Sequence, residues 1–301
     1  MRISPYLCIG FGVVCMSWAA ILIRLADAPP LVVAGYRLSM AVVILLPFAF
    51  LRSREELKTL DGGTWGWAVL SGIFLSIHFA GWVSSLSYTS VSSSVVIVTT
   101  YPIFVGIISH VFLREKVTTS MMAGILVAFS GGIVIGYGDF STGGNALFGD
   151  GLALLGSISG AGYFLIGRRL RAHVTLLSYI TVVYSTAAIV LLILAFGTGN
   201  FMSGYSWTTY AFILLLAVGP QLLGHSSLNW ALKYLSAVFV SISTLAEPVV
   251  STVLAALILD EAITTGKIAG SLLVLSGIFL VMGQERWTRA DNNPRSSHNE
   301  Q

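Results

Sequence analysis

Four of the ionisable residues that lie within long apolar stretches of this sequence are the first candidates for chemistry. They are Arg37, His78, His225 and Glu247. A charged or titratable side chain is costly in an apolar environment, so a chain that keeps one there often needs it for binding or proton transfer. Each residue also has a structural interpretation, because a hydrogen bond between helices would account for it equally well.

Glu247 stands directly before Pro248, which has no backbone N–H and leaves the carbonyl four residues earlier without its helical donor. A carboxyl beside such an opened helix can bind an ammonium group or take up a proton. We therefore predict that Glu247 binds substrate, and it is the candidate for proton coupling. The alternative is a carboxyl that hydrogen-bonds another helix and locks the fold.

His78 and His225 have two interpretations, as does Arg37. Imidazole can bind or relay protons near neutral pH, so the histidines are predicted to contact substrate or protons, or to pack as neutral residues between helices. Arg37 lies close to one end of its apolar stretch. There it can snorkel to the surface. It can pair with Asp27 or Asp260 as an outer gate, or attract an anionic group, and the alternative is a purely structural role.

Aromatic and amide side chains complete the predicted substrate-binding set, because they can line a cavity for a small molecule. They are Trp82, Tyr101, Tyr163 and Asn229. No catalytic residue, metal site or bound cofactor is predicted. Cys8 and Cys15 lie seven residues apart in one stretch, a separation that a disulfide cannot bridge on a helix.

The composition identifies the elements that hold these residues. Of the 301 residues, 55% are hydrophobic and 10% charged, whereas about a quarter of the residues in a soluble domain are charged. A membrane-spanning helix needs roughly 20 apolar residues. Ten runs of this kind predict an all-α integral membrane protein with ten transmembrane helices. The runs cover residues 5–23, 31–51, 64–87, 91–113, 120–137, 149–167, 174–196, 207–232, 237–259 and 268–283.

The Lys and Arg residues predict the orientation, because they concentrate on the cytoplasmic side of membrane proteins. With the N-terminus inside, thirteen of the 16 fall on the inner side. Arg24, Arg37 and Lys267 fall on the outer side or in the outer leaflet. Both termini are therefore expected in the cytoplasm. The expected partners are the lipid bilayer and a small-molecule substrate, and no continuous basic patch suggests nucleic acid. The oligomeric state cannot be read from the sequence.

An internal repeat organises the ten spans. Shifting the sequence by 146 residues lays the third to fifth spans on the eighth to tenth without a gap, and it makes Tyr101 the counterpart of Glu247. Under this shift Leu86, Tyr88 and Ser90 match Leu232, Tyr234 and Ser236, while Pro102, Glu115, Thr118, Gly124, Ser130 and Gly131 match Pro248, Glu261, Thr264, Gly270, Ser276 and Gly277.

Because each repeat holds five spans, the second must cross the membrane in the opposite orientation to the first. The basic residues Arg114 and Lys116 have Asp260 and Ala262 as counterparts, which agrees with that inversion. Inverted repeats are typical of secondary transporters, which bind substrate near the membrane midplane between the halves. We assign residues 1–143 to the first repeat, 144–284 to the inverted second repeat, and 285–301 to a disordered cytoplasmic tail.

The chain resembles the drug/metabolite transporter superfamily and, within it, the EamA family of ten-helix carriers, over about residues 6–283. The resemblance implies an inner (plasma) membrane carrier, often an exporter of amino acids or other small metabolites, with a central cavity lined by both halves. It does not fix the substrate. The motifs that carry it are Trp18, Gly35-Tyr36-Arg37, Tyr101-Pro102, Leu113-Arg114-Glu115, Gly149-Asp150, Ala246-Glu247-Pro248 and Leu259-Asp260-Glu261.

The sequence therefore predicts a secondary transporter for small neutral or zwitterionic, amino-acid-like metabolites. We expect alternating access, export, and protons as the candidate coupling ion. A membrane-embedded enzyme that uses His78, His225 and Glu247, or a channel, is the alternative. The sequence lacks the His-Glu-x-x-His, Walker and Gly-x-Ser-x-Gly motifs of common enzyme classes, and it has no filter-like loop or repeated ring of charges.

Overall fold

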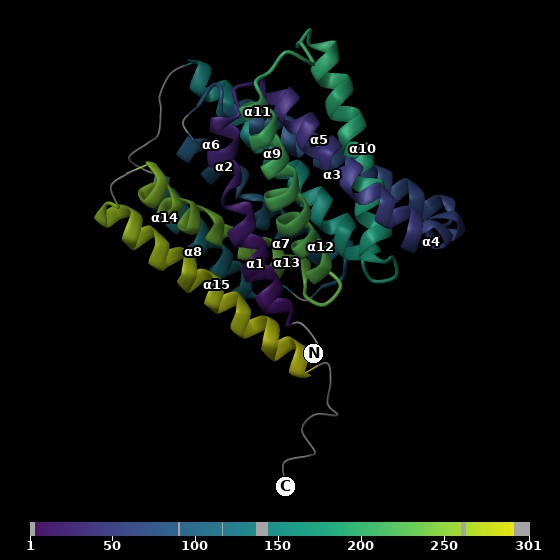
Figure 1. Ribbon diagram of the computed structural model, residues 1–301. Coiled ribbons are helices and arrows are strands. Elements are labelled where there is room, and N and C mark those ends of the chain that lie inside the picture. The colour runs from purple at the N-terminus through teal and green to yellow at the C-terminus, as the bar shows by residue number, and fades with distance from the viewer. Residues whose placement is uncertain (1–3, 90, 116, 137–143, 260–262, 292–301) are drawn as a thin grey trace.

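A computed structural model describes residues 4–89, 91–115, 117–136, 144–259 and 263–291. Within these ranges every regular element is a helix. Helix α1 (Pro5–Met16) begins and helix α15 (Thr265–Asp291) ends at the same end of the bundle, which we call the terminal end (Figure 1). The other end is called the opposite end.

The helices follow the predicted spans closely. Among the described residues, nine helical segments are long and apolar enough to cross a membrane, and the tenth predicted span is the shorter apolar helix Thr119–Ile135. The prediction of an all-α protein with ten apolar helices is confirmed. The first half contains α1, α2 (Ala19–Leu25), α3 (Pro30–Arg52), α4 (Arg54–Thr59), α5 (Gly62–Ser85), α6 (Val91–Val98), α7 (Tyr101–Phe112) and α8 (Thr119–Gly136). The second half contains α9 (Gly144–Leu170), α10 (Leu176–Gly197), α11 (Trp207–Leu216), the π-helix η2 (Ala217–His225), α12 (Ser226–Ala231), α13 (Ala237–Ser243), the 3-10 helix η3 (Thr244–Ala246), α14 (Glu247–Leu259) and α15.

Capping side chains set the start of several spans. Asp61, Thr175, Ser206 and Ser236 each accept a hydrogen bond from the backbone N–H of the third residue of the following helix. The first N–H groups of a helix have no partner within it, so a capping oxygen fixes where the helix begins. These polar residues stand just before apolar runs, which is why the sequence boundaries agree with the structure within a few residues.

The inverted repeat is visible where α8 packs along α15, its counterpart under the 146-residue shift (Figure 1). A Cβ on Gly124 would lie 2.9 Å from the carbonyl oxygen of Gly277, and one on Gly131 would lie 2.5 Å from that of Gly270. Gly124 corresponds to Gly270, and Gly131 to Gly277, so the shift exchanges the two contacts. This exchange is what a two-fold axis between the halves produces.

Several spans are interrupted along their length. The first span breaks between α1 and α2, the fourth between α6 and α7, and the ninth at η3, where Pro248 follows Glu247. The eighth contains the π-helix η2 with Pro220 inside it. Proline accounts for the last three breaks, because it cannot donate the helical hydrogen bond. Irregular backbone at this depth is typical of spans that line a cavity.

The structure differs from the prediction at the start of the C-terminal tail. Helix α15 continues to Asp291 and so includes the first seven residues of the segment 285–301, which was predicted to be disordered. Gln284, Glu285 and Arg286 are good helix formers, and they extend the helix beyond its apolar run. Residues 292–301, and residues 137–143 before the predicted junction of the repeats, lie outside the described residues.

Candidate functional site

A cavity lies between the two halves of the chain, beside the interrupted spans. It holds about 530 Å³ of space not filled by atoms, including its open mouth. Its wall reaches Trp82 and Val95, about one turn from the ends of α5 and α6 at the opposite end of the bundle. The wall is made by Met16, Ala19, Arg37, His78, Trp82, Val95, Val98, Thr99, Tyr101, Gly160, Tyr163, Phe164, His225 and Glu247.

The structure brings nearly all of the sequence candidates together in this wall. Six of the seven predicted substrate-binding residues line the cavity, and so does the gate candidate Arg37. Asn229 does not line it, but its Nδ2 donates a hydrogen bond to the hydroxyl of the wall residue Tyr163 at 2.5 Å. The six are His78, Trp82, Tyr101, Tyr163, His225 and Glu247.

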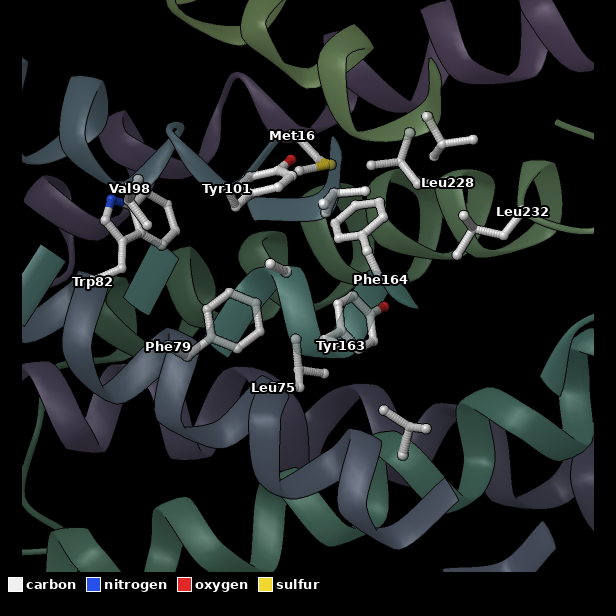
Figure 2. Packing of buried hydrophobic residues seen from close by; sticks show 14 of the residues in the cluster. Met16, Leu75, Phe79, Trp82, Val98, Tyr101, Tyr163, Phe164, Leu228 and Leu232 are labelled. Atoms are coloured by element: carbon white, nitrogen blue, oxygen red, sulfur yellow. The ribbon is translucent and has the colours of Figure 1, made fainter. Parts of the chain in front are cut away.

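Four aromatic residues line the cavity, Trp82, Tyr101, Tyr163 and Phe164, and Figure 2 shows their rings among the buried residues of the core. The ring of Tyr101 stacks on that of Phe164 with centroids 5.1 Å apart, and Tyr163 meets Phe164 edge-on at 5.5 Å. Phe79 and Trp82 come from α5, with their centroids 6.4 Å apart. Such rings offer a small molecule a large, rigid apolar contact area with few rotatable bonds.

His78 is fixed between α5 and α9. Its Nδ1 lies 2.8 Å from the carbonyl oxygen of Gly156. Because a carbonyl only accepts, Nδ1 carries the proton, and Nε2 is the nitrogen left for another partner. A Cβ on Gly160 would lie 2.9 Å from the same Nδ1, so the glycine makes room for the ring.

His225 lies at the centre of the pseudo-two-fold arrangement. The 146-residue shift pairs it with Phe79, one residue from His78, and the two counterpart rings meet edge-on with centroids 5.4 Å apart. The Nδ1 of His225 is buried and has no hydrogen-bond partner among the described residues. It therefore retains one unused polar atom beside the cavity.

Arg37 lies in the cavity wall and does not snorkel, because α5, α10 and η2 enclose this part of α3. Its side chain is 1% exposed, and its guanidinium carbon lies 4.4 Å from the centroid of the Phe79 ring. The Nε and Nη1 atoms have no hydrogen-bond partner among the described residues. Asp27 is exposed and forms no ion pair with Arg37, and Asp260 lies outside the described residues. The gate role stays a prediction.

Glu247 lies in the same cavity as Arg37. Both side chains line its wall, yet no ion pair within 4.0 Å joins them. The backbone carbonyl of Glu247 accepts a hydrogen bond from Ser17 at 3.4 Å, and the hydroxyl of Tyr101 hydrogen-bonds that of Thr244. These hydrogen bonds join the break of the ninth span, next to Glu247, to the breaks of the first and fourth spans.

A polar network crosses the terminal end of the bundle. Arg168 Nε lies 2.7 Å from Glu115 Oε1, and Arg168 Nη1 donates to the carbonyl of Leu232 at 2.6 Å. Glu115 Oε2 accepts from the backbone N–H of Ala237 at 3.1 Å. The network joins the α7–α8 connection and the end of α9 to the turn between α12 and α13.

Sequence reasoning missed the apolar part of the wall and the polar residues behind it. Met16, Val98 and Phe164 lie in apolar runs, where nothing marks a cavity-facing side chain as different from a lipid-facing one. Tyr184 and Gln221 are fully buried behind the wall. Gln221 carried a usable signal, because it is an amide in the middle of a predicted span, next to Pro220.

The sequence matches the EamA-like transporter family over residues 3–137 and 147–283, which covers most of both halves. The chain belongs to the EamA-like transporter family. It is 28% identical over 272 residues to an uncharacterized transporter of Archaeoglobus fulgidus, covering 89% of this chain and 94% of that protein. The uncharacterized transporter YoaV of Bacillus subtilis is 26% identical over 268 residues, covering 88% and 91% of the two chains.

A solved crystal structure has the same fold. It superposes with a TM-score of 0.81 at 16% sequence identity, over 96% of this chain and 99% of that one. At 16% identity the likeness concerns the fold alone. The family and the relatives identify this EamA protein as a multi-pass membrane transporter, as the sequence predicted.

Proposed function

We propose that this EamA protein is a secondary carrier that moves small neutral or zwitterionic, amino-acid-like metabolites by alternating access. Residues 1–143 and 144–284 act as the two halves that rock against each other. In the proposed orientation both termini lie in the cytoplasm, the chain spans the inner (plasma) membrane, and net transport is export.

The observation that carries the proposal is the cavity between the halves. It takes wall residues from both repeats, lies beside the broken spans, and extends toward the opposite end of the bundle. The network of Glu115 and Arg168 crosses the terminal end. The cavity is central and reaches toward one end, and the fold is built from inverted repeats. Both features fit a carrier that alternates between inward-open and outward-open states related by the two-fold axis.

The charges of the wall favour a substrate without large net charge. Among the described residues, the cavity wall contains one guanidinium, that of Arg37, and one carboxyl, that of Glu247. A strongly anionic substrate would meet the carboxyl and a cationic one the guanidinium, whereas a zwitterion can complement both. The aromatic rings of Trp82, Tyr101 and Phe164 supply contact area for an apolar side chain.

Counterflow tests the carrier proposal. Proteoliposomes are loaded with an unlabelled metabolite extract and diluted into the same extract labelled with ¹³C, and the labelled compounds that enter are identified by mass spectrometry. A carrier accelerates entry of the compounds present on the far side. Entry without such stimulation would favour a channel, and chemically altered compounds would favour the enzyme alternative.

Proton coupling through Glu247 is tested separately. Transport of the compounds found by counterflow is measured with and without a pH gradient, in wild type and in Glu247→Gln, which keeps the shape of the side chain but cannot ionise. We expect the gradient to drive wild-type transport and to have no effect on the variant. Equal rates with and without the gradient in wild type would refute the coupling and leave the carrier intact.

A further inference from the structure

The two repeats place chemically opposite stripes at the centre of the molecule. Gln221, His225 and Asn229 follow one another at intervals of four residues along η2 and α12. The 146-residue shift makes their counterparts Leu75, Phe79 and Val83 on α5. We call the first set the polar stripe and the second the apolar stripe. All six residues are buried.

The equal burial of the two stripes indicates that packing alone does not explain the polar residues of the second repeat. Leu75, Phe79 and Val83 are 0%, 0% and 2% exposed, so this position in the fold is well packed by apolar residues alone. Polar groups placed out of contact with water cost free energy unless they are hydrogen-bonded. The architecture therefore does not require the polar residues of the second repeat, and they need another explanation.

The polar stripe lies beside Arg37 and two tyrosines. Arg37 and His225 both contact the ring of Phe79, at 4.4 Å and 5.4 Å from its centroid, and both line the cavity with Tyr163. Asn229 donates to the hydroxyl of Tyr163 at 2.5 Å and lies 3.4 Å from that of Tyr184.

Gln221 lies one layer behind the wall, beside the hydroxyl of Tyr184. Its amide interacts with that hydroxyl outside standard hydrogen-bond geometry, so neither the amide nitrogen nor the amide oxygen has a regular hydrogen-bond partner among the described residues. The region around Arg37 is thus rich in polar atoms and short of partners for them.

Arg37 itself has the geometry of a receptor for a planar anion. The ring of Phe79, from the apolar stripe, covers one face of the guanidinium at 4.4 Å. The Nε and Nη1 groups are without hydrogen-bond partners among the described residues, and no carboxylate lies within ion-pair distance. Arg stacked on an aromatic ring keeps its edge free for two parallel hydrogen bonds to a carboxylate.

From these observations we infer that Arg37, supported by the polar stripe, is the specificity-determining residue that binds an anionic group of the substrate, a carboxylate by its fit. The inference rests on the proposed function and narrows it. The substrate is a zwitterion whose carboxylate points to Arg37 and η2, and whose ammonium group points to Glu247. Gln221 and Asn229 act as positioning residues that hold the tyrosine hydroxyls around the guanidinium.

Paired ligands test the inference. Inhibition of wild-type counterflow is measured with the 20 common L-amino acids and with the matching L-amino acid amides, which keep the ammonium group and side chain but lack the carboxylate. We expect the best acids to inhibit at least tenfold more potently than their amides. Equal potency of the two series, including no effect of either, would overturn the inference. The carrier would still stand, because counterflow of the labelled extract is measured independently.

Variants locate the effect on the polar stripe. Arg37→Gln should bring the acid and amide potencies to within about twofold of each other, and Arg37→Lys should leave an intermediate ratio, because an ammonium keeps the charge but not the fork of donors. Gln221→Leu introduces the residue that the first repeat already buries, so it should fold, and it should lower the ratio several-fold. The matched control is Leu75→Met, a volume-conserving change on the apolar stripe that should leave the ratio unchanged.

The outcome for the variants decides the inference even if Arg37→Gln fails to fold. In that case Arg37→Lys and Gln221→Leu must both lower the acid-to-amide ratio while counterflow of the labelled extract continues. A wild-type ratio in both variants, or an equal fall in Leu75→Met, would refute the assignment of Arg37 and the polar stripe.

Discussion

Replacing Glu115 by Gln should loosen the terminal end of the bundle. The carboxylate makes an ion pair with Arg168 at 2.7 Å through one oxygen and accepts from the N–H of Ala237 through the other. Ala237 is the first residue of α13, so the charge also lies at the positive end of a helix dipole. Gln can keep a hydrogen bond but loses both charge interactions.

The size of the effect follows from how far the pair is buried. Two unit charges about 4 Å apart attract by ~4 kcal/mol at an effective dielectric constant of ~20, whereas fully exposed pairs contribute ~0.2–1 kcal/mol after desolvation and screening. The side chains of Arg168 and Glu115 are 26% and 15% exposed, between these limits. We therefore expect a coupling of about 1–2 kcal/mol, which corresponds to a roughly 5- to 30-fold change in an opening equilibrium.

Hydrogen–deuterium exchange in lipid nanodiscs measures this opening. Exchange of the amides in residues 232–243 should be about 10- to 150-fold faster in Glu115→Gln than in wild type, because the loss of the ion pair and the loss of the charge at the helix N-terminus multiply, while amides where α3 packs on α10 should not change. In an Arg168→Gln background the same substitution should accelerate exchange only about two- to fivefold, the effect of losing a charge at a helix N-terminus alone, ~0.3–1 kcal/mol. If Glu115→Gln accelerated exchange by the same factor in wild type and in Arg168→Gln, the coupling between the two side chains would be refuted.

Two further predictions concern stability, both measured as thermal unfolding midpoints in detergent. Gly131→Ala should destabilise the fold by about 1–3 kcal/mol because its Cβ would lie 2.5 Å from a carbonyl oxygen of α15, whereas its neighbour Gly132, with no atom within 4 Å, should accept Ala without loss. Equal effects at the two positions would contradict the glycine contact. Burial raises the pKa of Glu56 in α4, but hydrogen bonds from Ser178 and Thr175 outweigh it, so the pKa lies below its ordinary value of 4.5. Such a carboxylate stabilises the folded state above pH 4.5, and this stabilisation disappears as the pH falls through the lowered pKa. Glu56→Gln should therefore unfold at lower temperature than wild type near pH 7, with a gap that narrows below pH 4.5; a gap independent of pH would contradict this account.

The sequence was most informative where a residue type has one physical consequence. Apolar runs of about 20 residues predicted the spans, and the matched pairs Gly124–Gly270 and Gly131–Gly277 predicted a repeat that the structure expresses as exchanged backbone contacts. Ionisable residues inside these runs predicted where to look for a site. Glu247, His78 and His225 do share one cavity, although their roles there stay predictions.

Other features depend on how the helices pack, which a single sequence does not specify. Arg37 is within reach of a membrane surface by its distance along α3, and only the packing of α5, α10 and η2 around it turns the side chain inward. The wall residues Val98 and Phe164 look like any other apolar residue of a span. The break in the first span has no proline. At this break the hydroxyl of Ser17 bonds the carbonyl of Val13, and the carbonyl of Ser17 accepts a hydrogen bond from Ser251.

A cysteine in the cavity tests alternating access most directly. Val98 is 4% exposed and lines the cavity, and Cys is close to it in size. Val98→Cys, made in a chain in which Cys8 and Cys15 are replaced, is reconstituted in known orientation and alkylated by a membrane-impermeant maleimide from either side. We predict labelling from both sides, with transported compounds changing the two rates in opposite directions. Labelling from one side only under all conditions, or from both sides at rates that substrate does not change, would contradict the account.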